Sequence, residues 1–308
     1  MNMGNTATDF STPILFIIFN REDTVRRSFE IIRNRRPTRL YIAADGPRNN
    51  KDGEKVLCES TRKIVENIDW PCAVHRKYRD ENVGTKINMS EAITWFFENE
   101  EEGIILEDDC LPDQTFFTFC EVLLSKYRNV DKVKMISGNN FQFGKTYGNE
   151  SYYFSLLPSI WGWATWRRAW KDYDITMKSY PEFKKSKKIR HMLHDTNMQR
   201  FMLGLFEKVY KNQMNTWAAR WIFAIYDKGG VAILPSVNLV SNVGFGETAT
   251  HTKSDTVLDS IKAESIETII HPAHIAINEE ADRESFYAIY YRPLHRRIFD
   301  KLKSFAKV

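Results

Sequence analysis

The chain has 308 residues, which at about 150 residues per domain corresponds to one large or two ordinary domains. Lysine and arginine number 44 and aspartate and glutamate 40, so the net charge of +4 provides no general field for a polyanion. The longest apolar run, at 14–19, falls far short of the roughly 20 residues that a membrane-spanning helix needs. Residues 1–13 contain no Lys or Arg and do not resemble a secretory signal. We therefore expect a cytoplasmic protein without a transmembrane helix and without nucleic acid as its partner.

Short β-rich runs alternate with amphipathic stretches in the first part of the chain. The predicted strands are 14–19, 40–44, 73–78, 104–107 and 133–137. Apolar residues at helical spacing predict helices around Val25 to Ile32, Met89 to Phe97 and Phe116 to Tyr127. Alternating strands and helices indicate an α/β fold with a mostly parallel sheet that is flanked by helices on both faces.

Beyond residue 140 the alternation is lost and aromatic residues become frequent. Four tryptophans fall within 158–170, where the Pro and Gly residues favour an irregular loop. Further helix faces are predicted around Met198 to Val209 and Trp217 to Ile225, with strands at 231–234 and 237–240. We predict a nucleotide-sugar-binding half at 12–140, an acceptor and closing half of the same domain at 141–252, and a C-terminal helical tail at 253–308.

Polar clusters follow three of the predicted strands. In an open parallel sheet the carboxyl ends of the strands meet at one edge, where ligands bind. The clusters are Asn20 and Arg21, the turn at 45–48 that begins with Asp45, and the triplet Glu107, Asp108 and Asp109. We expect all three clusters to share that edge.

Three successive carboxylates after a buried strand repel one another unless a cation compensates them. Carboxylate oxygens suit Mg²⁺ or Mn²⁺, which take one or two protein carboxylates and otherwise bind phosphates and water. The alternative is a solvated acidic turn that caps the helix starting near Pro112. Arg21 is suited to pair with a phosphate, and Asp45 to accept hydrogen bonds from a ribose or base, although a helix cap and an ordinary turn also explain them. Lys86, after Asn82-Val83-Gly84, is placed to meet a phosphate at a helix start.

These motifs, taken in this order, resemble the nucleotide-diphospho-sugar transferases of GT-A fold. Within that superfamily the chain is most similar to bacterial glycosyltransferases related to the animal N-acetylglucosaminyltransferase I family, whose metal motif is also Glu-Asp-Asp. The segments that carry the resemblance are 17–21, 45–48, 82–84 and 104–117, and it extends over residues 12 to 252. It implies a Rossmann-like GT-A fold with an aromatic-rich acceptor-side half, and metal-dependent transfer of a sugar from a UDP-sugar to a glycan hydroxyl.

The resemblance also implies roles for single residues. Asp109 binds the divalent ion, Mn²⁺ or Mg²⁺, that bridges the donor diphosphate. Asp108 and Glu107 contact the donor ribose and sugar. Asn20, Arg21 and Asp45 hold the nucleotide. His251, in the closing segment at 235–252, reaches the diphosphate or the metal, with a plain loop histidine as the alternative.

One departure concerns the catalytic base. The animal enzyme has a Trp-Asp-Asp-Trp stretch, whereas this chain has Ala218 and Ala219 between Trp217 and Trp221. An inverting transferase needs a base within reach of the acceptor hydroxyl. Glu247 is our candidate, and the rival carboxylates are Asp172, Asp174 and Asp195.

Flat aromatic side chains stack on sugars, but they also form cores. Trp161, Trp163 and Trp217 are assigned to the acceptor or sugar pocket, while Trp166 and Trp170 are expected in the core. Residues 294–308 have an apolar stripe flanked by Lys and Arg, which predicts either peripheral binding to an anionic membrane or a helix docked on its own domain.

Two other functions are compatible with the sequence. One is a non-catalytic protein of the same fold that binds a nucleotide sugar or a glycan. The other is a nucleic-acid binder using Arg33, Arg35, Arg36 and Arg39, which we disfavour because the carboxylates would repel phosphate unless they bind a metal.

Overall fold

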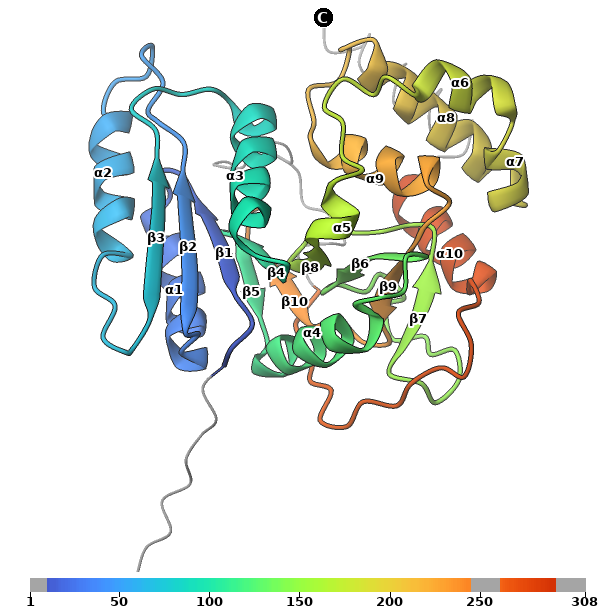
Figure 1. Ribbon diagram of the computed structural model, residues 1–308, viewed down its shortest axis with the longest axis horizontal. Coiled ribbons are helices and arrows are strands. Elements are labelled where there is room, and N and C mark those ends of the chain that lie inside the picture. Colours follow the sequence, from blue (N-terminus) through green and yellow to red (C-terminus); the bar gives the residue numbers. More distant parts are fainter. Residues whose placement is uncertain (1–9, 245–260, 292–308) are drawn as a thin grey trace, which may run out of the picture.

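A single mixed sheet runs through the molecule. The computed structural model describes residues 10–244 and 261–291, and in them eight strands lie in the order β3-β2-β1-β4-β8-β6-β9-β7 (Figure 1). The strands are β1 (Ile14–Ile18), β2 (Arg39–Ala44), β3 (Ala73–Tyr78), β4 (Glu102–Glu107), β6 (Val133–Ser137), β7 (Tyr152–Ser155), β8 (Trp163–Trp166) and β9 (Val231–Pro235). β1 to β4 are mutually parallel and β6 is parallel to β9, whereas β7 and β8 run antiparallel to their neighbours. The predicted α/β class with a mostly parallel sheet is confirmed.

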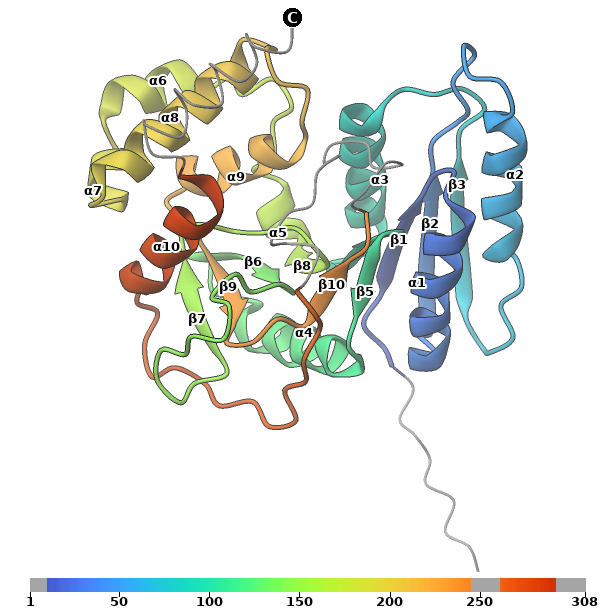
Figure 2. The ribbon, with the colours of Figure 1, turned by 180° about the vertical axis from the view of Figure 1, so that it is seen from behind.

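The first half follows the sequence pattern closely. β1 and β6 are buried along their whole length, which explains their continuous apolar sequences. α1 (Glu22–Arg35) and α3 (Thr85–Asn99) lie on opposite faces of the sheet, as the two opposed views show (Figures 1 and 2). α4 (Gln114–Tyr127) begins where the Asp113 side chain accepts a hydrogen bond from the Thr115 backbone N–H at 2.8 Å.

Three elements differ from the expectation. α2 (Glu54–Ile64) has no apolar stripe, because its buried residues are Glu54, Cys58 and Thr61. β8 replaces part of the loop predicted at 158–170, and it lies antiparallel between β4 and β6. The strand predicted at 237–240 is shifted to β10 (Val240–Asn242), which pairs with β5 (Cys110–Pro112) outside the main sheet.

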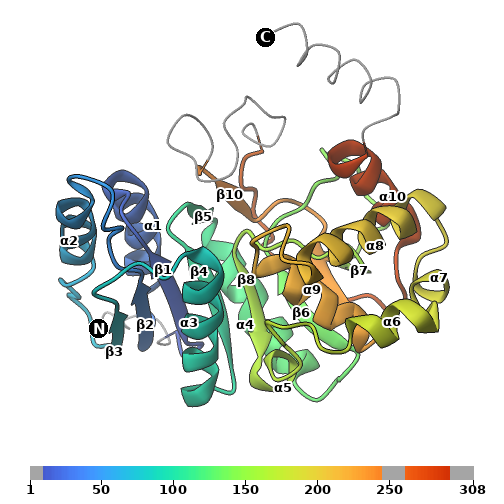
Figure 3. The same ribbon diagram turned by 90° about the horizontal axis from the view of Figure 1, so that it is seen from above.

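The second half completes the same sheet and adds a helical layer beyond it (Figure 3). Its helices are α5 (Arg167–Trp170), α6 (Tyr180–Ser186), α7 (Ile189–Met192), α8 (Thr196–Tyr210) and α9 (Ala218–Asp227). In the predicted tail, α10 (Glu279–Ser285) and a π-helical turn (Phe286–Tyr290) follow a non-helical stretch at 261–278. The helix predicted at 294–308 lies outside the described residues. No helix in the described ranges is long and apolar enough to cross a membrane.

Candidate active site

The polar residues after β1 and β4 come together at one edge of the sheet. Parallel pairing places Ile17 opposite Glu107 and Ile18 opposite Ala44, so the residues that follow are neighbours. Arg21, at the start of α1, forms ion pairs with Asp108 and, at 3.0 Å, with Asp109. The predicted meeting of these clusters is confirmed.

Arg21 is the principal compensating charge for the acidic triplet. Burial favours its neutral form, but the charges of Asp108 and Asp109 outweigh burial and raise the pKa of the guanidinium. The Arg21 side chain is 25% exposed and that of Asp108 only 5%, so this pair is poorly screened by water. The Ser28 hydroxyl also donates to the Asp108 backbone oxygen at 2.7 Å, which fixes α1 against the end of β4.

One arginine does not neutralise three carboxylates. Burial, followed by the charges of Asp109 and Asp108, raises the pKa of Glu107 to about 8. Burial also raises the pKa of Asp108 to about 6, although Arg21 opposes that rise. The Asp108 Oδ2 atom is buried and has no hydrogen-bond partner. The site therefore has unmet demand for positive charge or for hydrogen-bond donors.

Asp109 is held by the short ribbon of β5 and β10. Its Oδ1 atom accepts a hydrogen bond from the Asn242 amide at 3.1 Å, and its backbone oxygen accepts one from Val243 N–H at 2.9 Å. A Cβ added at Gly244 would lie 2.2 Å from Asp109 Oδ2, so only glycine permits this close approach. The described part of the segment that begins at 235 thus contacts the acidic triplet through Asn242 and Val243.

The donor set fits a divalent ion that is held mainly by its substrate. A carboxylate offers about four acceptor positions, and the Asp109 carboxylate accepts from Arg21, from Asn242 and, at 3.8 Å, from the Cys110 thiol, which leaves room for an ion. In the described ranges no group of three or more His, Cys, Asp or Glu side chains is arranged so that protein ligands alone could hold a metal ion. Mg²⁺ and Mn²⁺ are compatible with such a site, because phosphates and water supply their remaining ligands.

Asp45 organises the loop before α3. Its carboxylate accepts from Val83 and Gly84 N–H, both at 3.0 Å, and from the Asn82 amide at 3.0 Å. A fourth donor is Gly46 N–H at 2.9 Å. Protein donors thus fill its acceptor positions, so the structure gives Asp45 a positioning role, while contact with a nucleotide stays a prediction.

Replacing Asp45 with alanine is expected to loosen residues 82–84. The backbone N–H groups of Gly46, Val83 and Gly84 lose their acceptor, and each unsatisfied group costs about 1–3 kcal/mol if it stays buried. Hydrogen exchange at Val83 and Gly84 should accelerate markedly. The exposed Asp80, replaced by alanine, is the matched control. Unchanged exchange in the Asp45 variant would contradict the positioning role.

A second polar cluster, which the sequence did not reveal, lies beside Asn20. The buried Glu54 accepts from the Asn20 amide at 2.9 Å and from Arg48 N–H at 2.7 Å, and it pairs with the Arg48 guanidinium. Hydrogen bonds from the Arg48 side chain lower the pKa of Glu54 despite its burial. Asn20 is therefore oriented by the start of α2.

Lys86 lies in the first turn of α3, next to the loop that Asp45 holds. The first backbone N–H groups of a helix have no partner within it and attract anions. Gly84, which precedes this helix, has a φ of 80°, a positive value that glycine adopts without strain. This placement suits a phosphate, and Lys86 remains a predicted contact.

Two of the three tryptophans assigned to the sugar pocket belong to the core. Trp163 is 1% exposed and Trp217 4%, and their rings stack with centroids 5.9 Å apart. Trp166 and Trp170 are buried as predicted. Trp161 alone is half-buried, and its ring meets Phe141 edge-on at 5.1 Å. The assignment of Trp163 and Trp217 is corrected, because four-way packing with Trp170 and Trp221 outweighs any exposure.

Three of the carboxylates considered as catalytic base are among the described residues, and each makes contacts within the protein. Glu247 and His251 lie outside the described residues. Asp172 pairs with Lys134 at 3.0 Å, and Asp174 accepts the Thr176 N–H of its own turn at 2.8 Å. Asp195 caps α8 and also accepts a hydrogen bond from the Tyr287 hydroxyl at 2.9 Å. Each described rival is thus engaged in a structural contact.

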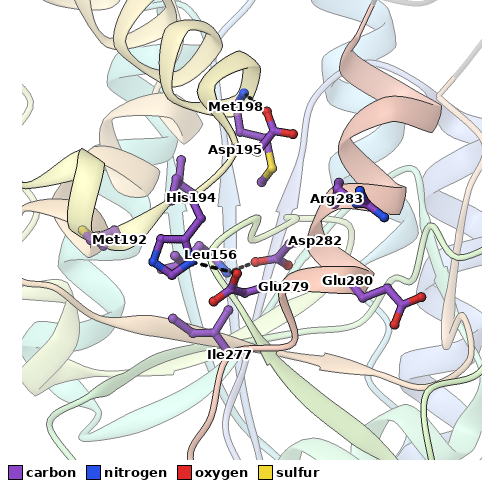
Figure 4. A pocket seen from close by; sticks show the side chains of 11 residues that line it. Leu156, Met192, His194, Asp195, Met198, Ile277, Glu279, Glu280, Asp282 and Arg283 are labelled. Atoms are coloured by element: carbon purple, nitrogen blue, oxygen red, sulfur yellow. Dashed lines mark hydrogen bonds and ion pairs between the residues drawn. The ribbon is translucent and has the colours of Figure 1, made fainter.

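Asp195 nevertheless borders a cavity of about 480 Å³ between α10 and the start of α8 (Figure 4). His194 and Glu279 pair across it at 2.9 Å. Asp282 is buried at its wall and accepts hydrogen bonds from the Ser155 hydroxyl and, at 2.8 Å, from Leu156 N–H. Burial raises the pKa of Asp282 to about 7.

Asp282 is expected to make the folded state less stable as pH rises. Its pKa is higher in the folded chain than the ordinary 3.8, so the folded state binds the proton more tightly between those values. The free energy of unfolding should fall by about 1.4 kcal/mol per pH unit in that window and level off above pH 7. Asp282→Asn keeps hydrogen bonding but cannot ionise, so urea titrations at pH 5 and 7 should show a smaller decrease for this variant. An equal decrease in the free energy of unfolding between pH 5 and 7 for the wild type and Asp282→Asn would contradict this role of Asp282.

Comparisons with known proteins show only a distant likeness. The sequence matches no protein family and no curated protein. HddC from Yersinia pseudotuberculosis matches with a TM-score of 0.31 and 10% identity, over 53% of this chain and 80% of that one. Its complex with GMP-PN gives a TM-score of 0.31 at 8% identity, with the same coverage. A 4-diphosphocytidyl-2C-methyl-D-erythritolsynthase from Anaerococcus prevotii gives 0.34 at 9% identity, over 73% and 89% of the two chains. Function must therefore be argued from the site itself.

Proposed function

We propose that the chain is a divalent-metal-dependent glycosyltransferase that uses a UDP-sugar donor and a glycan hydroxyl as acceptor. The observation that supports this most is the acidic triplet at the end of β4, whose charge Arg21 compensates only in part. A purely solvated acidic turn would be exposed, whereas Asp108 is 3% exposed and has an oxygen without a partner. Such an arrangement costs stability and is expected at a ligand site.

Each residue of the site has a separate role in the proposed reaction. Arg21 and Lys86 bind phosphate oxygens, and Asn20, oriented by Glu54, contacts the nucleotide. Asp109, steadied by Asn242, holds the ion, and Glu107 and Asp108 contact the donor ribose and sugar. When bound, the ion neutralises charge on the departing diphosphate.

In the transfer itself, the bond between the anomeric carbon and the diphosphate oxygen breaks. The acceptor oxygen forms the new glycosidic bond, and its proton passes to a base. Glu247 remains the proposed base and His251 a proposed second metal ligand.

The alternative is a non-catalytic binding protein of the same fold. Ala218 and Ala219 favour it, since they begin α9 where the family has its Asp. Arg220 beside them is buried and donates to backbone oxygens of Ile175 and Thr216, so this segment serves packing.

Turnover separates the two functions. The full chain is incubated with UDP-sugars and Mn²⁺, with and without a pool of glycan acceptors, and released UDP is measured. Acceptor-stimulated UDP release supports the transferase. Tight UDP-sugar binding without any UDP release would support the binding protein instead.

We also expect a nucleotide preference for UDP over GDP and CMP. The expectation rests on Asn20 and Arg21 lying together at the end of β1 and on the resemblance. A ligand at 100 times its Kd stabilises the native state by about 2.7 kcal/mol. Thermal unfolding with each nucleotide and Mn²⁺ should therefore rank UDP first. A ranking with GDP first would overturn the preference.

A further inference from the structure

A cavity of about 560 Å³ lies at the sheet edge, beyond the ends of β6 and β9. Its walls come from 140–146, from 236–238 and from 261–264. β6 and β9 are parallel to each other, and β6 runs in the same direction as β4 because both are antiparallel to β8. The cavity is therefore at the edge that also holds the acidic triplet. Its volume is within the range of about 300–1,000 Å³ of small-ligand sites.

The cavity lies close to the acidic triplet, because one short segment contributes to both. Asn238, in the cavity wall, and Asn242, which contacts Asp109 at 3.1 Å, are four residues apart. Even fully extended, four residues span at most about 14 Å. β5 and β10 lie between the two places, so the cavity is on the side of the triplet away from β2 and β3.

The cavity wall is rigid. Asn238 accepts a hydrogen bond from Asn140 N–H at 3.0 Å, and the Asn140 amide donates to the Pro235 backbone oxygen at 2.6 Å. Gln142 is 3% exposed and donates to the Ala281 backbone oxygen at 2.8 Å. These bonds anchor the chain up to the residue before Phe143.

Phe143 then turns outward. It is 46% exposed, whereas Phe141 is 7% exposed. Its φ of 51° is in the left-handed region, which is unfavourable for any residue with a side chain other than Asn or Asp. A strained backbone that presents an aromatic ring at the rim of a cavity indicates a binding function.

The remaining lining combines the apolar Val237 and Ile261 with polar groups and is nearly neutral. Thr146 and Ser236 present hydroxyls that no described residue hydrogen-bonds. Lys262 and Glu264 contribute opposite charges. An aromatic face with neutral hydrogen-bonding groups suits an uncharged pyranose ring, whose C–H face stacks and whose hydroxyls hydrogen-bond.

We propose that this cavity binds a pyranose of the acceptor glycan, with Phe143 as its stacking platform. The assignment of the bound sugar to the acceptor rests on the proposed transferase function, whereas the binding of a pyranose in this cavity does not depend on it. The donor sugar is expected nearer the triplet, on the side of β1 and β4. Phe143 thereby becomes a determinant of acceptor specificity.

The test measures binding of a panel of methyl pyranosides to the full chain by calorimetry and saturation-transfer NMR. The panel contains the glucoside, galactoside, mannoside and N-acetylglucosaminide. We expect at least one to bind, and Phe143→Ala and Phe143→Gly to weaken it at least tenfold. Phe143→Gly should keep or raise the melting temperature, because glycine accepts the left-handed φ. Phe143→Trp should retain binding.

Tyr210→Ala, at another exposed aromatic residue on α8, is the control and should leave pyranoside binding unchanged. UDP binding with Mn²⁺ is measured in parallel and should be equal in all variants. Absence of pyranoside binding, or unchanged binding in Phe143→Ala and Phe143→Gly, would overturn the proposal. Failure of the transferase function alone would appear as pyranoside binding that depends on Phe143, without acceptor-stimulated release of UDP.

Discussion

Arg21→Ala is expected to lower the free energy of unfolding by about 3–5 kcal/mol at pH 7.5, the cost of removing one partner from a buried ion pair. The variant leaves Asp108 almost fully buried without a counter-charge, next to Glu107 and Asp109. Urea unfolding of the metal-free protein measures the loss.

A control variant and a change of pH show whether the loss of stability comes from the buried ion pair. Arg27→Ala removes an exposed arginine of the same helix, 3.9 Å from Asp23, and should cost less than about 1 kcal/mol. Lowering the pH to 5 should reduce the cost of Arg21→Ala, because the raised pKa values of Glu107 and Asp108 let these groups take up protons. Stability unchanged by Arg21→Ala would show that the guanidinium does not compensate the triplet.

Asp109→Ala is expected to lower donor turnover by a factor on the order of 10³, because an ion at a departing diphosphate contributes several kcal/mol. The fold should survive, since Arg21 keeps its ion pair with Asp108. Removing one of three repelling carboxylates should leave the metal-free protein as stable as the wild type or more so.

Asp69→Ala is the matched control for this variant. Asp69 is 60% exposed and lies 3.5 Å from Arg33, so its removal should change neither turnover nor stability appreciably. Circular dichroism and thermal unfolding verify the fold of both variants. Normal turnover in folded Asp109→Ala would remove this residue from the site.

The sequence predicts the strands and helices of the first half well because the burial pattern of each element is visible in its own residues. β1 and β6 are buried on both faces and are therefore continuous apolar runs. α1 and α3 bury a stripe of the predicted spacing. Since parallel strands end at one edge, the contact of Arg21 with Asp108 also follows from the order of the elements.

What the sequence does not predict depends on non-local packing. α2 buries a glutamate and a threonine, so its inner face has no apolar signature. Trp163 lies in a segment whose composition suggests a sugar-binding loop. It is in fact part of an antiparallel strand, and the sequence does not reveal which strands lie beside it. Phe143 is a single aromatic residue, and nothing in its sequence context reveals a left-handed backbone.

The roles of single polar groups are similarly hidden. The sequence predicts Asp45 to be a nucleotide ligand. In the structure its carboxylate accepts four hydrogen bonds from the protein, three of them from the loop after β3. Asn242 and Asp109 are 133 positions apart and meet only because β10 pairs with β5.

We propose that the end of β4 is a metal-dependent nucleotide site, and calorimetric titration of the full chain with UDP, in Mn²⁺ and again in EDTA, tests this claim. We predict binding in Mn²⁺ that is at least about tenfold weaker, a difference of about 1.4 kcal/mol, in EDTA. Equal affinity under the two conditions, or no UDP binding under either, would contradict the claim.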